Sequence, residues 1–129
     1  MPIAVVRLGT PRKPNEGLRL GTVRRPPRGV PKAEHATRDF YDVWLPNLSP
    51  SPELVADGKL SQDDKSWSDF KRKYRLEMNA PDVAKILDLL AALSHQTNLS
   101  IGCYCEDESR CHRSILTELL AERGASMLD

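Results

Sequence analysis

Apolar residues follow strand-like patterns at both ends of the chain. The segments 3–8 (IAVVRL) and 18–23 (LRLGTV) are short, rich in branched or alternating apolar residues, and bounded by turn residues, which is typical of strands. The stretch 99–105 (LSIGCYC) alternates strictly along its length, so it predicts a further strand. Two strands are therefore expected early in the chain and one late.

Helical patterns fill most of the sequence after residue 50. A short helix is expected from Ser51 to Gly58, because Pro52 is favourable at a first helical position. Longer helices are expected at 62–78, from Pro81 to about the SHQTN segment, and from about Ser109 to Arg123. This order of elements predicts a compact three-layer α/β domain, with helices packed on a small, partly parallel sheet.

The helix expected at 62–78 has two distinct faces. Ser61 and Asp64 form an S-x-x-D start, and large apolar residues then recur at helical spacing: Trp67, Phe70, Tyr74 and Met78. These residues are expected to anchor the core. The opposite face carries Lys71, Arg72, Lys73 and Arg75, a pattern typical of a solvated face and also compatible with a nucleic-acid contact.

Length and composition indicate one cytoplasmic domain over residues 1–129. A chain of 129 residues is too short for two ordinary domains, and 29% charged residues are normal for a globular protein. No apolar run approaches the roughly 20 residues that span a bilayer, so no membrane association is expected. Three cysteines are an odd number, which argues against a closed disulfide framework and favours reduced thiols.

Charge is distributed unevenly along the chain. Residues 1–32 hold eight basic side chains and one acidic one, 8 − 1 = +7, whereas the remainder holds 11 basic and 17 acidic ones, 11 − 17 = −6. A basic third can attract an anionic ligand or nucleic acid, and it can equally be a solvated face balanced by the acidic remainder.

The densest candidate chemistry lies in residues 100–120, SIGCYCEDESRCHRSILTELL. This stretch contains all three cysteines and runs from a predicted strand into a predicted helix. Ligands of α/β domains tend to bind beyond the carboxyl ends of strands, and a helix N-terminus stabilises thiolates and anions. We therefore interpret this corner as the candidate site.

One interpretation is a metal site. Cys103, Cys105, Cys111 and His112 are four ligands that zinc or iron accepts, although their spacing is not a usual two-knuckle pattern. Cys111 and His112 are expected to be adjacent on the last helix, about 100° apart, so they cannot easily converge on one ion. A protein without a cofactor is the simpler expectation.

A second interpretation is a reactive thiol, with Cys105, Cys111 and His112 as candidate catalytic residues. The spacing Cys105-x4-Arg110 superficially matches the anion loop of rhodanese-type sulfurtransferases, but this loop holds three carboxylates. A C-x-x-C redox pair is absent from the sequence.

Two further interpretations need no covalent chemistry. Arg28, Arg110, Arg113 and His112 could hold a phosphate or carboxylate with help from the helix N-terminus. Alternatively, the cysteines are small core residues and the charged residues are solvated or capping. The residues alone leave these alternatives open.

Several motifs together resemble the YeaO-like proteins, also called domain of unknown function 488. They are the Arg25-Pro26-Pro27-Arg28-Gly29 loop, the segment VWLPNLSPSPEL, the helix WSDFKRKYRLE, and Cys111-His112-Arg113 at the start of the last helix. The resemblance covers roughly residues 3–123 and implies a compact three-layer α/β fold, but no established reaction. It departs at Pro26, where the family usually has tryptophan.

The resemblance focuses attention on the Arg-Pro-Pro-Arg-Gly loop and the cysteine corner, which could meet at one sheet edge. Our leading hypothesis is a protein that binds a small anionic ligand there, with thiol-dependent conversion as an extension. The ligand-binding candidates are Arg25, Arg28, Arg110 and Arg113. The alternatives are a nucleic-acid-associated module that uses the basic N-terminal third, and a Cys/His metal-binding protein.

Overall fold

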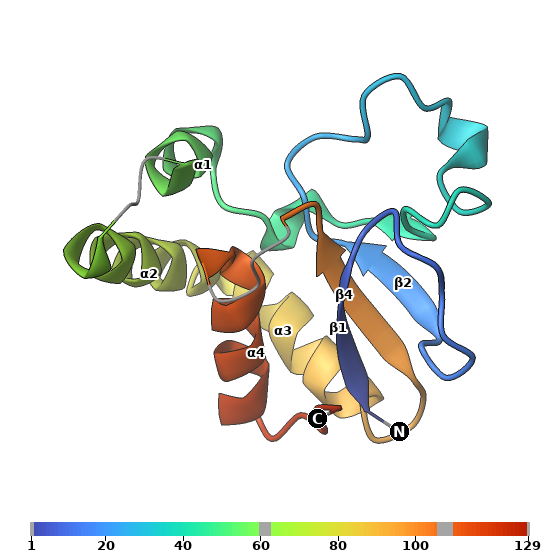
Figure 1. The fold of residues 1–129 in the computed structure, drawn as a ribbon. Helices are drawn as coiled ribbons and strands as arrows, with labels where there is room; N and C mark the ends of the chain where they lie inside the picture. Colours follow the sequence, from blue (N-terminus) through green and yellow to red (C-terminus); the bar gives the residue numbers. More distant parts are fainter. Residues whose placement is uncertain (1, 60–62, 106–109, 129) are drawn as a thin grey trace.

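The computed structural model describes residues 2–59, 63–105 and 110–128. Its four strands form one sheet in the order β1-β4-β2-β3: β1 (Ile3–Arg7), β2 (Leu18–Gly21), β3 (Val43–Trp44) and β4 (Leu99–Cys103) (Figure 1). All neighbouring pairs of these strands run parallel. The predicted α/β class is confirmed, and the sheet is wholly rather than partly parallel over these strands.

Strand β4 lies at the centre of the sheet, because β1 and β2 both pair with it. Leu99 is level with Ile3 of β1 on one side and with Leu18 of β2 on the other. Every residue of β4 is buried. Burial on both faces is expected for a parallel sheet, whose connections cross over its faces.

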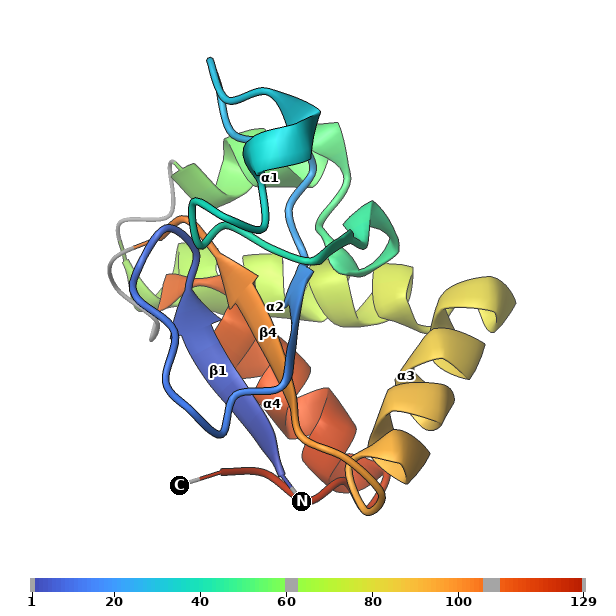
Figure 2. The same ribbon diagram turned by 90° about the vertical axis from the view of Figure 1, so that its right-hand side faces the viewer.

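The α-helices gather on one side of this sheet (Figures 1 and 2). They are α1 (Pro52–Lys59), α2 (Asp64–Met78), α3 (Pro81–Leu93) and α4 (His112–Glu122). Connecting segments cover the other face, with a short 3-10 helix, η1 (Lys32–Glu34), among them (Figure 2). A second 3-10 helix, η2 (Pro46–Leu48), precedes α1. The third layer is therefore made of loops rather than of α-helices.

Close packing of these loops depends on two strand glycines. An added Cβ at Gly21 would lie 2.3 Å from the Tyr41 ring, and one at Gly102 would lie 2.5 Å from the Leu8 side chain. The loop face forms its own apolar cluster, which includes Leu8, Tyr41 and Cys103.

Helix α2 supplies the core residues that its sequence pattern predicts. Phe70, Tyr74 and Met78 are buried, and the partly buried Trp67 packs against the same cluster. The predicted helix start at Ser61 lies outside the described residues. The observed N-cap is Asp63, whose carboxylate accepts a 2.7 Å hydrogen bond from the Ser66 backbone N–H.

One arginine of the basic N-terminal third is fully buried rather than solvated. Arg19 is 0% exposed, and its Nη2 lies 2.7 Å from Oε1 of Glu16. Its Nη1 also donates to the carbonyl oxygens of Thr10 and Asp39. Burial alone would raise the pKa of Glu16, but hydrogen bonds from the Lys13 backbone N–H and from Arg19 hold that pKa below its ordinary value.

The C-terminal segment pairs with Ile3, the first residue of β1. The Ile3 N–H donates to the Ser126 carbonyl at 2.8 Å, and the Leu128 N–H donates to the Ile3 carbonyl at 2.8 Å. Both described ends of the chain therefore lie at the same end of the sheet (Figure 1). No helix among the described residues is long and apolar enough to cross a membrane.

Candidate functional site

The cysteine corner and the Arg-Pro-Pro-Arg-Gly loop lie at the same edge of the sheet. Because β2 and β4 are parallel neighbours, their carboxyl ends meet there, and the Thr22 N–H donates to the Gly102 carbonyl at 3.0 Å. Further along, the Tyr104 hydroxyl donates to the Arg25 carbonyl at 3.0 Å. This hydrogen bond holds the loop that follows β2 beside Tyr104, the residue before Cys105.

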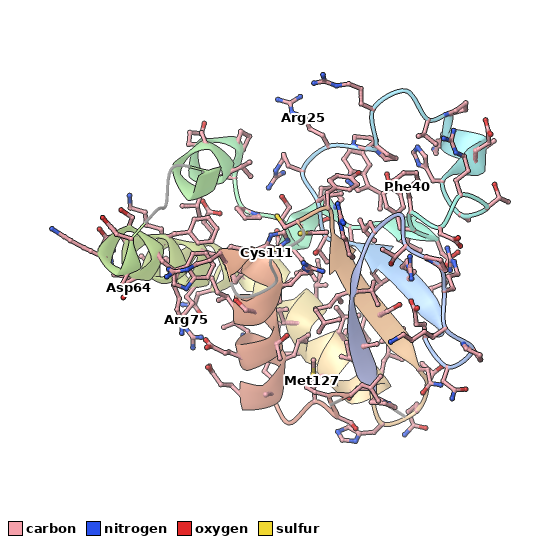
Figure 3. The ribbon with its side chains drawn as sticks, in the orientation of Figure 1. Arg25, Phe40, Asp64, Arg75, Cys111 and Met127 are labelled. Atoms are coloured by element: carbon pink, nitrogen blue, oxygen red, sulfur yellow. The ribbon has the colours of Figure 1, made fainter. Side chains whose placement is uncertain are left out.

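The three thiols differ sharply in their exposure. Cys103 at the end of β4 and Cys111 before α4 are each 2% exposed, and their Sγ atoms lie 2.7 Å apart. Cys105 is exposed, and its backbone N–H donates to the Cys103 sulfur at 3.3 Å. Figure 3 shows sulfur atoms gathered just above the start of α4, beside Cys111. Two buried thiols therefore lie under one accessible thiol.

Cys111 is the N-cap of α4 rather than a residue of the helix. Its backbone is extended, with φ −119° and ψ 150°. As a result, its sulfur lies 3.7 Å from Nδ1 of His112, the first residue of the helix. Cys103, Cys111 and His112 each offer a ligand atom, and these atoms all lie within 4.8 Å of one another. The objection that Cys111 and His112 diverge by about 100° is therefore wrong, because that angle applies only between two helical residues.

The position of the His112 proton follows from its acceptor. Nε2 lies 2.6 Å from the Thr22 carbonyl oxygen, which can only accept, so Nε2 carries the hydrogen and Nδ1 presents a lone pair. The ring packs edge-on against Tyr74, with centroids 5.6 Å apart. Burial lowers the pKa of His112 to about 4, although the hydrogen bond to Thr22 acts against this shift. The imidazole is therefore neutral at pH 7.

The thiols also differ in acidity. Hydrogen bonds from the Cys103 and Cys111 thiols lower the pKa of Cys105, with smaller contributions from His112 and Arg113. The pKa of Cys103 is raised by its hydrogen bonds with Cys105 and Cys111, and by burial. For Cys111, the bond with Cys103 lowers the pKa, but the bond with Cys105 and burial outweigh it, so the pKa is raised. Negative charge in the cluster is therefore favoured on the exposed sulfur.

Two of the predicted ligand-binding arginines hold protein groups. Arg113 is 2% exposed, and its Nη atoms donate to the carbonyl oxygens of Val6 and Cys105, each at 2.6 Å. Arg110 lies 2.7 Å from the Asp64 carboxylate at the start of α2, and its guanidinium lies over the Trp67 ring, 5.7 Å from the centroid. Arg113 thus positions the backbone of Cys105, and Arg110 joins the corner to α2.

The other two predicted ligand-binding arginines, Arg25 and Arg28, are exposed on the loop. Figure 3 shows Arg25 above the corner, with its side chain directed outward. The structure thus brings the loop backbone to the thiols and leaves these two guanidinium groups accessible to solvent.

A family model described as "Active DUF488-N3 subclade" matches residues 3–124. The chain belongs to the DUF488 family. This finding confirms the resemblance to the YeaO-like proteins, and the matched residues include the whole corner. No curated protein and no solved structure matches the chain significantly.

Sequence reasoning missed two groups at the corner of this DUF488 domain. The Thr22 carbonyl, which fixes the His112 proton, carries no side-chain signal that a motif could show. Tyr74 was expected only as a core residue, and it also packs against the His112 ring. Its hydroxyl donates to the Leu48 carbonyl at 2.6 Å, which links α2 to the segment before α1.

Proposed function

We propose that the corner binds a small anionic ligand and that Cys105 supplies a nucleophilic thiolate for its conversion. One observation carries this proposal: of the three cysteines, all of which are described, Cys105 alone is exposed while the other two thiols lie buried beside it. A thiolate at an accessible position is the reactive form of cysteine.

The neighbouring groups have supporting roles. Hydrogen bonding with the Cys103 and Cys111 thiols lowers the pKa of Cys105 and so favours its anion. His112 presents the lone pair of Nδ1 toward Cys111 and can accept a proton from that thiol. Arg113 holds the Cys105 carbonyl, which fixes the backbone that carries the nucleophile.

Alkylation of the folded protein tests the nucleophile. Iodoacetamide forms a carbon–sulfur bond with a thiolate and releases iodide, so its rate follows the thiolate fraction. We expect Cys105 to react at least about tenfold faster than Cys103 and Cys111, because the buried thiols are protonated and shielded. Since its pKa is lowered, the rate at Cys105 should persist below the ordinary thiol pKa of about 8.5 and fall only at lower pH. Peptide mass spectrometry measures each site, and Cys105→Ser is the control. Equal labelling of the three sites, or a midpoint above the ordinary pKa, would contradict the proposal.

The preference for an anion is tested separately by comparing iodoacetate with iodoacetamide at Cys105. These reagents differ in charge but carry the same leaving group. Replacing Arg25 and Arg28 together by Gln should lower the iodoacetate-to-iodoacetamide rate ratio about two- to fivefold, because two exposed positive charges are removed from the loop whose backbone is bonded to Tyr104. Arg72→Gln, on the exposed face of α2, is the matched control and should leave the ratio unchanged. If the ratio does not change when the loop arginines are replaced, the proposed anionic ligand is contradicted and the proposed nucleophile is not.

Ion pairs within the domain favour this proposal over the nucleic-acid alternative. In the N-terminal third, Arg12 pairs with Asp42 at 2.7 Å and Arg19 is buried with Glu16. On α2, Lys71 pairs with Glu118 at 2.9 Å, and Arg75 pairs with Glu122 at 2.7 Å. Much of the basic charge is therefore neutralised locally. Binding to DNA or RNA that weakens steeply with salt would favour the alternative.

A further inference from the structure

The approach of the two buried sulfurs favours a sulfur–sulfur bond over a shared metal ion. A disulfide bond is about 2.05 Å long, so the Cys103 and Cys111 sulfurs at 2.7 Å need to approach by about 0.65 Å, 2.7 − 2.05, to form one. Two thiolates bound tetrahedrally to zinc, with bonds of about 2.3 Å, lie about 3.8 Å apart. Seating zinc would therefore require these sulfurs to separate by about 1.1 Å, 3.8 − 2.7.

Exposure decides which sulfur meets an oxidant first. Cys103 and Cys111 are each 2% exposed, whereas Cys105 is open to solvent. The Cys105 N–H donates to the Cys103 sulfur, and the Arg113 guanidinium holds the Cys105 carbonyl at 2.6 Å. The backbone of the exposed cysteine is thus held beside Cys103, whose sulfur lies 2.7 Å from that of Cys111.

We propose that the three thiols form a relay that reduces hydroperoxides, in which Cys105 is oxidised first and Cys103 and Cys111 end as a disulfide. This inference rests on the proposed nucleophilic role of Cys105 and names a class of substrate for the same site. It gives the buried sulfur pair a redox role beyond stabilising the Cys105 thiolate.

The relay has three steps. The Cys105 thiolate attacks the terminal oxygen of a hydroperoxide, the O–O bond breaks, and the alkoxide leaves as an alcohol after protonation, so that Cys105 becomes a sulfenic acid. Cys111 then attacks the Cys105 sulfur, the S–O bond breaks, and the departing hydroxide leaves as water. Nδ1 of His112, 3.7 Å from the Cys111 sulfur, lies in position to accept the Cys111 proton.

The third step is thiol–disulfide exchange. Cys103 attacks the Cys111 sulfur, the bond between Cys105 and Cys111 breaks, and Cys105 is released as a thiolate. The net reaction converts one hydroperoxide and two thiols into one alcohol, one water and one disulfide. Cys103 and Cys111 supply the two electrons, and a dithiol reductant returns them to the protein for another cycle.

Disulfide mapping of the full chain tests the relay. The protein is fully reduced, freed of reductant and metal under anaerobic conditions, treated with one equivalent of hydrogen peroxide, and trapped with N-ethylmaleimide. We expect an intact mass lower by two hydrogen atoms before trapping, a Cys103–Cys111 linkage, and N-ethylmaleimide on Cys105. Dithiothreitol should reverse the change. A Cys105 sulfinic acid without any linkage, or a linkage only between two chains, would overturn the relay.

Single variants resolve the order of the steps. Cys105→Ser should slow disulfide formation at least tenfold, Cys103→Ser should stop the relay at a Cys105–Cys111 disulfide, and Cys111→Ser should accumulate a sulfenic acid that dimedone traps. Disulfide formation at an unchanged rate in Cys105→Ser would overturn the order proposed. The wild-type map decides the main question even if a variant fails to fold.

Two further measurements separate this inference from its alternatives. Fast iodoacetamide labelling of Cys105 in the same reduced sample, without a disulfide after peroxide, would overturn the relay and leave the proposed nucleophile intact. Slow labelling of Cys105 together with slow disulfide formation would overturn both. One zinc ion per chain, retained during purification and released only when Cys103 or Cys111 is replaced, would overturn the relay in favour of a metal site.

Discussion

Replacing Arg19 by Met should lower the free energy of unfolding by about 3–5 kcal/mol, because it leaves a charged carboxylate buried without its partner. Glu16 is only 4% exposed, and both Nε and Nη2 of Arg19 donate to it, at 3.1 and 2.7 Å. The variant also removes the donor that joins the Thr10 and Asp39 carbonyls. Urea denaturation, followed by circular dichroism, measures the loss.

A surface arginine–glutamate pair provides the matched control. Arg75 lies 2.7 Å from Glu122, and the Glu122 side chain is 53% exposed, so Arg75→Met should cost less than about 1 kcal/mol. Adding Glu16→Gln to Arg19→Met should recover part of the loss, because the buried charge is then removed. Equal losses for the Arg19 and Arg75 variants would show that the buried pair has no special role.

Replacing Gly17 by Ala should destabilise the fold by about 2–5 kcal/mol through two separate effects. The residue has φ +69°, where a side chain costs about 1–2 kcal/mol. An added Cβ would also lie 2.0 Å from the Asn98 carbonyl oxygen, and relieving such a clash costs about 1–3 kcal/mol. Asn98 directly precedes β4, so the clash displaces the start of the central strand.

Gly29→Ala separates the two effects. Gly29 has a similar φ of +74°, but an added Cβ would meet nothing within 4 Å. This variant should therefore cost only the conformational term of about 1–2 kcal/mol. The urea midpoints of the two variants, each compared with that of the unchanged chain, give the difference between their losses of stability. If both variants lose the same stability, the contact with Asn98 is not a constraint on the fold.

Residues with a repeating pattern could be placed from the sequence. Trp67, Phe70, Tyr74 and Met78 lie one helical turn apart, and the structure confirms that they pack into the core. The corner could be located as well, because a strand that alternates and then runs into a helix start leaves few other arrangements. The place of the cysteines at this corner follows from their positions at the end of the strand and the start of the helix.

Features that depend on contacts between distant segments could not be predicted. Arg19 counts as a basic surface residue in the sequence, and only the fold shows it buried with Glu16 beneath the Thr10 and Asp39 carbonyls. Cys111 and His112 looked like two helical neighbours, because the helix was expected from about Ser109 and starts at His112, a shift at a helix start that periodicity does not resolve. That shift decides whether their side chains diverge or meet.

The central place of β4 has a consequence for the order in which the protein folds. Strands β1 and β2 pair with β4 and not with each other, so neither gains this partner until residues 99–103 have been synthesised. During synthesis the first three-quarters of the chain therefore emerge from the ribosome without the strand that joins the sheet. Such long-range parallel pairing slows folding and leaves strand edges open to association with other chains in the meantime. In this DUF488 domain, β4 leads into the thiols, and the sheet cannot assemble around it until β4 has been synthesised.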